Sequence, residues 1–170
     1  MRPLPARAKV VSRGEAARRV RAARRRGERV VFTSGCFDLL HAGHVRSLEE
    51  ARRLGDRLVV GVHADATVRR LKGAGRPVLP LRQRAELLGA LACVDWVFAF
   101  SEPTPRESLA AVAPDVYAKG GDWPLATLRA KDAPPGFSGA IRRLRQVPGV
   151  RSSEIVAAIR AGRRLGGRRR

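Results

Sequence analysis

The chain has 170 residues, 44% of them hydrophobic, a length and composition that predict one domain with a core of its own. Its two cysteines, Cys36 and Cys93, lie in apolar contexts without the spacing of metal ligands or of a disulfide framework, which predicts a reduced, cytoplasmic protein. No apolar stretch approaches the ~20 residues of a membrane span, and the N-terminus lacks the apolar block of a signal peptide, so we expect neither.

Charge is the most unusual feature of the composition. The formal net charge is +20, and only four of the 35 basic residues are lysine. The arginines gather mainly at residues 18–29 and 163–170, which is typical of solvated helix faces and tails. Contact with a polyanion is the alternative, but few aromatic residues are interleaved with the arginines, so a base-stacking surface is not supported.

Strand-like and helix-like segments alternate along the chain. A leading helix is predicted over residues 15–26, where Ala16, Val20 and Ala23 recur at helical spacing. Short β-branched runs follow at 29–35, 57–65, 94–102 and 115–122, and segments of helical period lie between them at 44–56, 81–92 and 104–114. This alternation predicts an α/β fold, a doubly wound parallel sheet with helices on both faces.

The last third of the sequence is less regular. Three consecutive helix breakers, residues 134–136, predict a loop over residues 130–139. Residues 140–147 suit a last strand, which Arg142 and Arg143 would make an exposed edge. A final helix is predicted from about residue 152, with Ser152 or Ser153 as its N-cap.

The segment "SGCFDLLHAGH", residues 34–44, follows the first predicted strand directly. Gly35 permits a tight turn, and Gly43 lies where a helix would begin, with His41 and His44 beside its free N–H groups. Such a cluster of amides and imidazoles suits a polyphosphate. In the alternative reading Asp38 caps the turn and the histidines only fill polar positions.

The pattern D-x-x-H-x-G-H resembles the HxGH signature of the nucleotidyltransferase superfamily. The longer segments "RLKGAGRPV" and "KGGDW" resemble, more specifically, the adenylyltransferases that join AMP to D-glycero-β-D-manno-heptose 1-phosphate. The resemblance covers residues 13–162 and implies a Rossmann-like, five-stranded parallel sheet in the order 3-2-1-4-5. Residues 1–12 are then expected to be an N-terminal extension and 163–170 a basic tail, in a transferase that stands alone, without the kinase domain of the bifunctional enzymes.

The resemblance also implies roles for individual residues. His41 and His44 are expected to contact the triphosphate, and Asp38 to orient a histidine or the local loop. Lys72 is expected to contact phosphate from a glycine-flanked loop after the second strand. The other residues expected to line the crevice for the nucleotide and sugar phosphate are Cys36, Phe37, Gly43, Lys119, Gly120, Gly121, Asp122, Arg151, Ser152 and Ser153.

Three positions keep two interpretations each. Arg84 either reaches a phosphate or forms an exposed salt bridge. Asp65 either caps the following helix or holds the Lys72 loop, and Trp123 either approaches the nucleotide or only packs. Two departures from the family pattern bear on the site: Ser34 stands where these enzymes typically have asparagine, and Arg151 stands for the first hydroxyl of a phosphate-binding helix start.

The implied reaction transfers AMP from ATP to a sugar 1-phosphate, releasing pyrophosphate. Mg²⁺ is expected to be held mainly by the ATP phosphates, because the sequence offers no carboxylate cluster dedicated to a metal. The alternatives are a cytidylyltransferase for glycerol 3-phosphate or a similar alcohol phosphate, and a polyanion-binding protein on an inactive fold. A homodimer and a contact with nucleic acid stay open.

Overall fold

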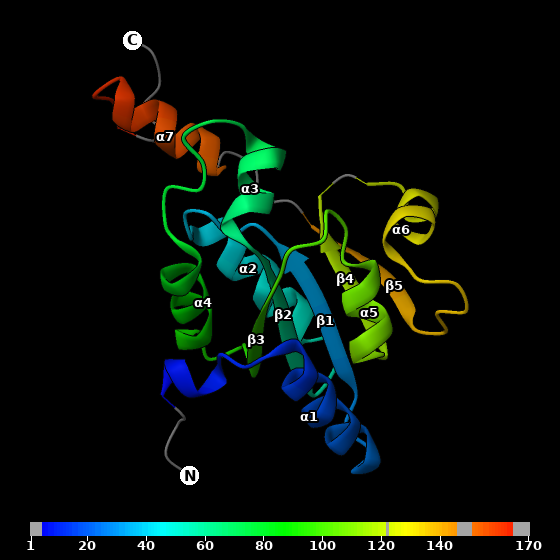
Figure 1. Cartoon of the computed structure of the whole chain (residues 1–170). Coiled ribbons are helices and arrows are strands. Elements are labelled where there is room, and N and C mark those ends of the chain that lie inside the picture. Colours follow the sequence, from blue (N-terminus) through cyan, green and yellow to red (C-terminus); the bar gives the residue numbers. More distant parts are fainter. Residues whose placement is uncertain (1–4, 122, 146–150, 165–170) are drawn as a thin grey trace.

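The computed structural model describes residues 5–121, 123–145 and 151–164, and it contains a five-stranded parallel sheet (Figure 1). The strand order is β3-β2-β1-β4-β5, which confirms the expected order. The strands are β1 (Val30–Gly35), β2 (Arg57–His63), β3 (Trp96–Phe100), β4 (Val116–Gly120) and β5 (Ala140–Leu144). Since β1 pairs with β2 on one side and with β4 on the other, the order of strands reverses at β1.

Helices cover both faces of this sheet (Figure 1). One core cluster packs α1 (Arg13–Arg25), α5 (Arg106–Val112) and α6 (Leu125–Asp132) against one face. A second cluster packs α2 (Ala42–Arg52) and α4 (Leu81–Ala90) against the other. The remaining helices are the 3₁₀ helix η1 (Ala6–Lys9), α3 (Asp65–Lys72) and α7 (Ser152–Arg160). The predicted doubly wound architecture is therefore confirmed.

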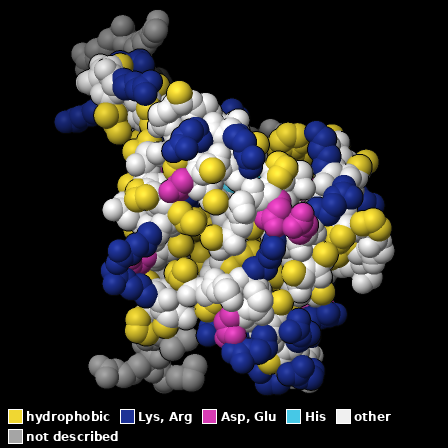
Figure 2. Space-filling model, viewed as in Figure 1, with side chains coloured by type: hydrophobic (Ala, Val, Ile, Leu, Met, Phe, Trp, Pro, Cys, Tyr) yellow, Lys and Arg dark blue, Asp and Glu magenta, His cyan; other side chains and the backbone are white. Residues whose placement is uncertain are grey.

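The leading helix forms as its apolar spacing predicts. The Ser12 side chain caps α1 by accepting a hydrogen bond from the Glu15 backbone N–H at 3.1 Å. Ala16, Val20 and Ala23 are fully buried against the sheet, whereas the arginines of the helix lie on its outer side. Figure 2 shows basic side chains gathered at the lower end of the molecule, where α1 lies.

Three local predictions need correction. Residues 65–72 form α3, a helix that was not predicted, so Lys72 is the last residue of a helix instead of part of a loop. The predicted loop over 130–139 overlaps α6, which continues to Asp132 and ends before the two prolines. The N-cap of α7 is Arg151, whose backbone N–H donates to the Glu154 carboxylate, and neither serine takes that position.

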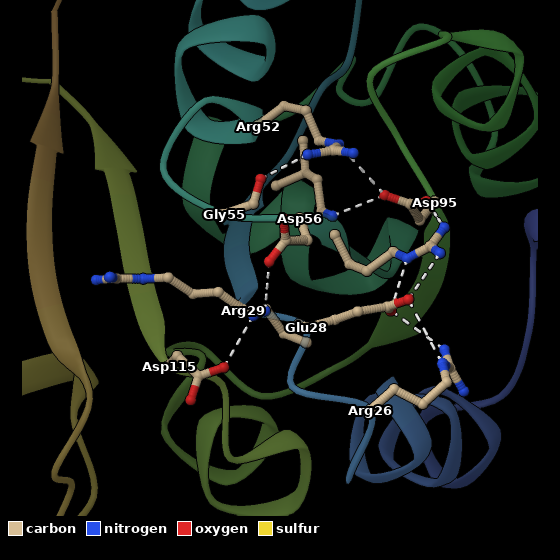
Figure 3. A network of polar contacts seen from close by, with 11 residues as sticks. Arg26, Glu28, Arg29, Arg52, Gly55, Asp56, Asp95 and Asp115 are labelled. Atoms are coloured by element: carbon tan, nitrogen blue, oxygen red, sulfur yellow. Dashed lines mark hydrogen bonds and ion pairs between the residues drawn. The ribbon is translucent and has the colours of Figure 1, made fainter. Parts of the chain in front are cut away.

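Carboxylates hold neighbouring strands together at the end of the sheet where β1 and β2 begin (Figure 3). Asp115 accepts a hydrogen bond from the Val30 N–H at 2.8 Å, and Asp95 accepts one from the Leu58 N–H at 2.8 Å. Asp56 accepts one from the Arg29 N–H at 2.7 Å. Each aspartate directly precedes a strand and binds the start of a neighbouring one, so it holds the register between them.

The residues before α1 pack on the domain. η1 contacts α4, the Lys9 ammonium donates to the carbonyls of Leu91 and Val94, and Val10 forms a bridge with Val97 of β3. Residues 6–10 thus extend the cover of the sheet at its β3 edge. Within the described ranges, no helix is long and apolar enough to cross a lipid bilayer.

Candidate active site

A cleft of about 980 Å³ opens at the carboxyl ends of β1, β2 and β4. Parallel strands place their carboxyl ends together, and the reversal of strand order at β1 separates the loops there. The expected site residues that line this cleft are Cys36, Phe37, Asp38, His41, Gly43, His44, Lys72, Lys119, Gly120, Gly121, Trp123, Arg151, Ser152 and Ser153. Asp122 lies outside the described residues. Segments far apart in the sequence therefore meet in one cavity.

The two histidines lie at the N-terminus of α2. His41 is the N-cap residue, and its Nδ1 accepts a hydrogen bond from the His44 backbone N–H at 3.4 Å. The two imidazole rings stack with their centroids 3.8 Å apart. Both side chains thus lie beside the free N–H groups and the positive end of the helix dipole, a geometry that suits a phosphate.

Burial keeps both imidazoles neutral near neutral pH. It lowers the pKa of His41, and together with the neighbouring His41 it lowers the pKa of His44 from 6.5 to about 4. Since His41 Nδ1 accepts a hydrogen bond, the neutral ring carries its proton on Nε2. His41 can therefore donate a hydrogen bond to a phosphate oxygen without carrying a positive charge.

Asp38 fixes the loop that follows α3 instead of a histidine. Its buried carboxylate accepts hydrogen bonds from the backbone N–H of Val78 at 2.6 Å and of Leu79 at 3.2 Å, and it also pairs with Arg76. The expectation was that Asp38 orients a histidine or its own local loop, whereas the loop that it contacts is 76–79, distant in sequence. Arg76, which sequence reasoning missed, lines the cleft through this pair.

Arg84 forms an ion pair with Asp65, and neither residue lines the cleft. The Arg84 side chain is fully buried, so the expectation of an exposed salt bridge is wrong. Its guanidinium donates to the carbonyls of Leu79, Cys36 and His63 and to the Asp65 carboxylate, at 2.6 to 3.0 Å. With its donors engaged in this way, Arg84 holds the ends of β1 and β2 together instead of reaching a phosphate. Asp65 is the first residue of α3, after the N-cap Ala64, and it pairs with Arg84 instead of capping α3 or holding Lys72.

Lys72 and Cys36 both line the cleft. Lys72 ends α3, and Gly73 after it adopts φ +90°, a conformation that releases the chain from the helix. Burial raises the pKa of the Cys36 thiol, which therefore stays protonated. Cys36 is thus part of the wall of the cleft and not an activated nucleophile.

Lys119 connects the carboxyl ends of β1 and β4, and the loops that follow these strands both line the cleft, as expected. Its ammonium donates to Ser34 Oγ at 3.3 Å and lies 3.7 Å from the carboxylate of Asp132 on α6. The same carboxylate accepts a hydrogen bond from the buried Tyr117 hydroxyl at 2.6 Å. Burial lowers the pKa of Lys119, and Asp132 opposes that shift. This polar cluster lies at the carboxyl ends of the two central strands.

The start of α7 closes one side of the cleft. Arg151, Ser152 and Ser153 line it, and the Ser152 hydroxyl donates to the Leu39 carbonyl at 3.3 Å, which ties α7 to the loop that carries His41. Trp123 lies at the opposite side with 48% of its surface exposed, and the Lys131 ammonium stands 5.9 Å from its ring centre. Trp123 therefore lines the cleft instead of packing into the core.

Two buried residues of the cleft were missed by sequence reasoning. His63 ends β2, and Asp132 ends α6. The signal for His63 was its place at the end of an apolar strand, the same position that Gly35 and Gly120 hold in β1 and β4. Asp132 gave no such signal, because it precedes a segment rich in proline and glycine.

Within the described part of the chain, no group of three or more His, Cys, Asp or Glu side chains could hold a metal ion. The donors in the cleft are mainly imidazoles, ammonium groups, hydroxyls and backbone N–H groups. Such donors bind phosphate oxygens, and a cation would reach the cleft with the ligand that it coordinates.

Comparisons with known proteins agree with this geometry. The profile of the cytidylyltransferase-like family matches residues 32–158. The bifunctional protein HldE of Proteus mirabilis is 49% identical over 138 residues, which cover 81% of this chain and 29% of that protein. HldE of Methylococcus capsulatus is 52% identical over 140 residues, or 82% of this chain and 30% of that protein. The chain thus spans less than a third of the length of these curated relatives.

A solved structure with a similar fold supports the same family. The lipopolysaccharide core biosynthesis protein of Thermoplasma volcanium superposes with a TM-score of 0.61 at 29% identity, covering 71% of this chain and 99% of that one. The family profile covers most of the chain, including the histidine motif, most of β1, the other four strands and most of α7. The chain therefore belongs to the cytidylyltransferase-like family of nucleotidyltransferases.

Proposed function

We propose that this protein transfers AMP from ATP to a sugar 1-phosphate, giving a nucleotide sugar and pyrophosphate. The acceptor proposed is D-glycero-β-D-manno-heptose 1-phosphate, so the product is ADP-heptose. The observation that carries the proposal is the cleft itself, in which the α2 N-terminus with its stacked histidines faces Lys72, Lys119 and the start of α7. The bifunctional HldE proteins, about half identical to this chain over one part of their length, support the choice of acceptor.

The reaction requires that the two substrates be positioned and that the phosphate charge be neutralised, and it does not require a strong base. An oxygen of the sugar phosphate attacks the α-phosphorus of ATP, a new P–O bond forms, and the bond to pyrophosphate breaks in line. Because the attacking oxygen is already anionic near neutral pH, no group has to remove a proton from it. This requirement agrees with a cleft whose histidines are neutral and whose cysteine is protonated.

Different residues of the cleft have different roles in this reaction. His41 Nε2 and the N–H groups at the start of α2 donate to the α-phosphate as negative charge develops there. Lys72, Arg151 and the serines after it attract the outer phosphates and the leaving pyrophosphate. Mg²⁺, bound by the triphosphate, supplies further neutralisation of charge.

The test is pyrophosphate release by the purified protein with Mg²⁺, with ATP and CTP offered in parallel. The acceptors are heptose 1-phosphate, other sugar 1-phosphates and glycerol 3-phosphate. We expect turnover with ATP and heptose 1-phosphate, and loss of it in the variant His41→Ala, His44→Ala. A strong preference for CTP with glycerol 3-phosphate would replace this proposal by the cytidylyltransferase alternative, and no product from any pair would refute an enzymatic role.

A further inference from the structure

The carboxyl ends of the strands divide the cleft into two chemically different halves. Phe32 of β1 and Tyr117 of β4 pack into the core under α1, α5 and α6. Side chains two residues apart on a strand point to the same face, so Ser34 and Lys119 also face that side. The histidines of α2 lie on the other side, with the second core cluster. One half thus lies at the α2 N-terminus, and the other lies between the sheet and the helices α5 and α6.

His63 belongs to the α5–α6 half. It ends β2 beside Phe100 of β3, and the two rings lie 4.2 Å apart between centroids. Only 4% of its surface is exposed, yet it lines the cleft. Its Nδ1 is buried and has no hydrogen-bond partner among the described residues. The fold thus leaves one nitrogen of this imidazole unpaired, and the ring as a whole borders the cleft.

The groups around His63 suit hydroxyls better than a triphosphate. The Asp132 carboxylate faces the same half of the cleft and lies 3.7 Å from the Lys119 ammonium, whose charge it offsets. A carboxylate repels phosphates but accepts hydrogen bonds from hydroxyls. Burial, followed by the charges of Lys119 and Arg84, lowers the pKa of His63 to about 4. The neutral ring carries one donor and one acceptor; the backbone of Glu102 competes for one of them, and the other is left for a sugar hydroxyl.

We propose that the α5–α6 half of the cleft receives the hydroxyl-bearing ring of the acceptor, and that the imidazole of His63 hydrogen-bonds one of its hydroxyls. The inference rests on the proposed function, because it assigns the acceptor of that reaction to one half of the same cleft. It makes His63 a residue that determines acceptor specificity, while the nucleotide phosphates lie at the α2 N-terminus. The competing arrangement places the ribose of ATP in the α5–α6 half.

Imidazole NMR signals test this assignment directly. The sequence has only three histidines, His41, His44 and His63, so single substitutions assign every signal. Heptose 1-phosphate should move the His63 signals, whereas adenosine 5′-(α,β-methylene)triphosphate with Mg²⁺ should move those of His41 and His44. Movement of the His63 signals by the nucleotide analogue and not by the sugar phosphate would overturn the proposal in favour of the ribose.

A pair of variants separates a binding role from a structural one. His63→Phe keeps a ring against Phe100 but removes both nitrogens, and His63→Asn keeps a polar side chain. We expect His63→Phe to raise KM for the sugar phosphate about 3- to 10-fold, the effect of one neutral hydrogen bond, with KM for ATP changed less. His63→Asn should recover part of this loss. Equal changes in both KM values, or no change in either, would contradict a contact with the acceptor.

The two experiments also distinguish this inference from the proposed function. If the wild-type protein turns over ATP and heptose 1-phosphate while the His63 signals stay in place, the function stands and the role of His63 is refuted. If the sugar phosphate moves the His63 signals and no pyrophosphate is released, the binding site stands and the proposed reaction is refuted. If no acceptor phosphate moves the His63 NMR signals, the inference is overturned, whether or not the protein releases pyrophosphate.

Discussion

Replacement of Arg84 by methionine should destabilise the fold by about 3–5 kcal/mol. The guanidinium is fully buried and donates to three backbone carbonyls, those of Leu79, Cys36 and His63. Methionine has a similar length and no donor, so the three acceptors lose their partner. A buried group left unsatisfied costs about 1–3 kcal/mol, and the contact with the His63 carbonyl is the most deeply buried of the three. The pair with Asp65 adds little, because that carboxylate is 38% exposed and stays hydrated.

Urea unfolding followed by circular dichroism measures this loss, with Arg82→Met as the matched control. Arg82 lies on the same helix, is exposed, and should change the free energy of unfolding by less than about 0.5 kcal/mol. Arg84→Lys should also destabilise, because one ammonium cannot reach three separate carbonyls. A loss below about 1 kcal/mol for Arg84→Met, or one equal to that of Arg82→Met, would refute the argument that this arginine connects the ends of β1 and β2.

Other predictions follow from the cleft. The double variant His41→Ala, His44→Ala should lower kcat/KM by more than about 1,000-fold. Because the His41 side chain also caps α2, the melting temperature of this variant should lie a few degrees below that of Arg46→Ala, an exposed control on the same helix. Retained turnover would remove both imidazoles from the reaction. Asp38→Asn should raise hydrogen exchange in the loop after α3 and lower kcat/KM about 10- to 100-fold, and unchanged exchange would contradict the loop-fixing role. Burial holds the pKa of His63 near 4, so the unfolded chain takes up the proton first as pH falls from about 6.5 and stability decreases. Chemical denaturation at about pH 7 and about pH 5 should therefore show a smaller decrease for His63→Phe than for the wild type, and equal decreases would contradict a neutral, buried His63.

The sheet and the general position of the cleft could be predicted because they depend on periodic apolar patterns. Strand-like runs closed by glycine, as in 29–35, indicate both a buried strand and the turn that follows it. The strand order followed from the family resemblance, and the reversal at β1 then placed the loops after β1 and β4 opposite one another. The histidines of the α2 N-terminus could be predicted because their pattern, D-x-x-H-x-G-H, lies directly between a predicted strand and a predicted helix.

The roles of individual polar residues could not be read in the same way. Arginines are so frequent in this chain that nothing in the sequence separates the buried Arg84 from its exposed neighbour Arg82. Burial of a charged group depends on which carbonyls surround it, and those come from two different loops and the end of β2. The helix α3 was missed because its apolar signal is short, with Val68 its only fully buried aliphatic residue. Asp132 was missed because its partners, Tyr117 and Lys119, are contacts of tertiary structure.

Three aspartates hold the sheet together at the end opposite the cleft, where the strands begin. Asp56, Asp95 and Asp115 fasten the beginnings of neighbouring strands, whereas the carboxyl ends of the same strands carry the loops of the cleft. The sheet is therefore held at both ends, because Arg84 connects the carboxyl ends of β1 and β2 beside the cleft. The loops that line the cleft thus stand on a frame whose polar contacts at both ends oppose the sliding of one strand past its neighbour.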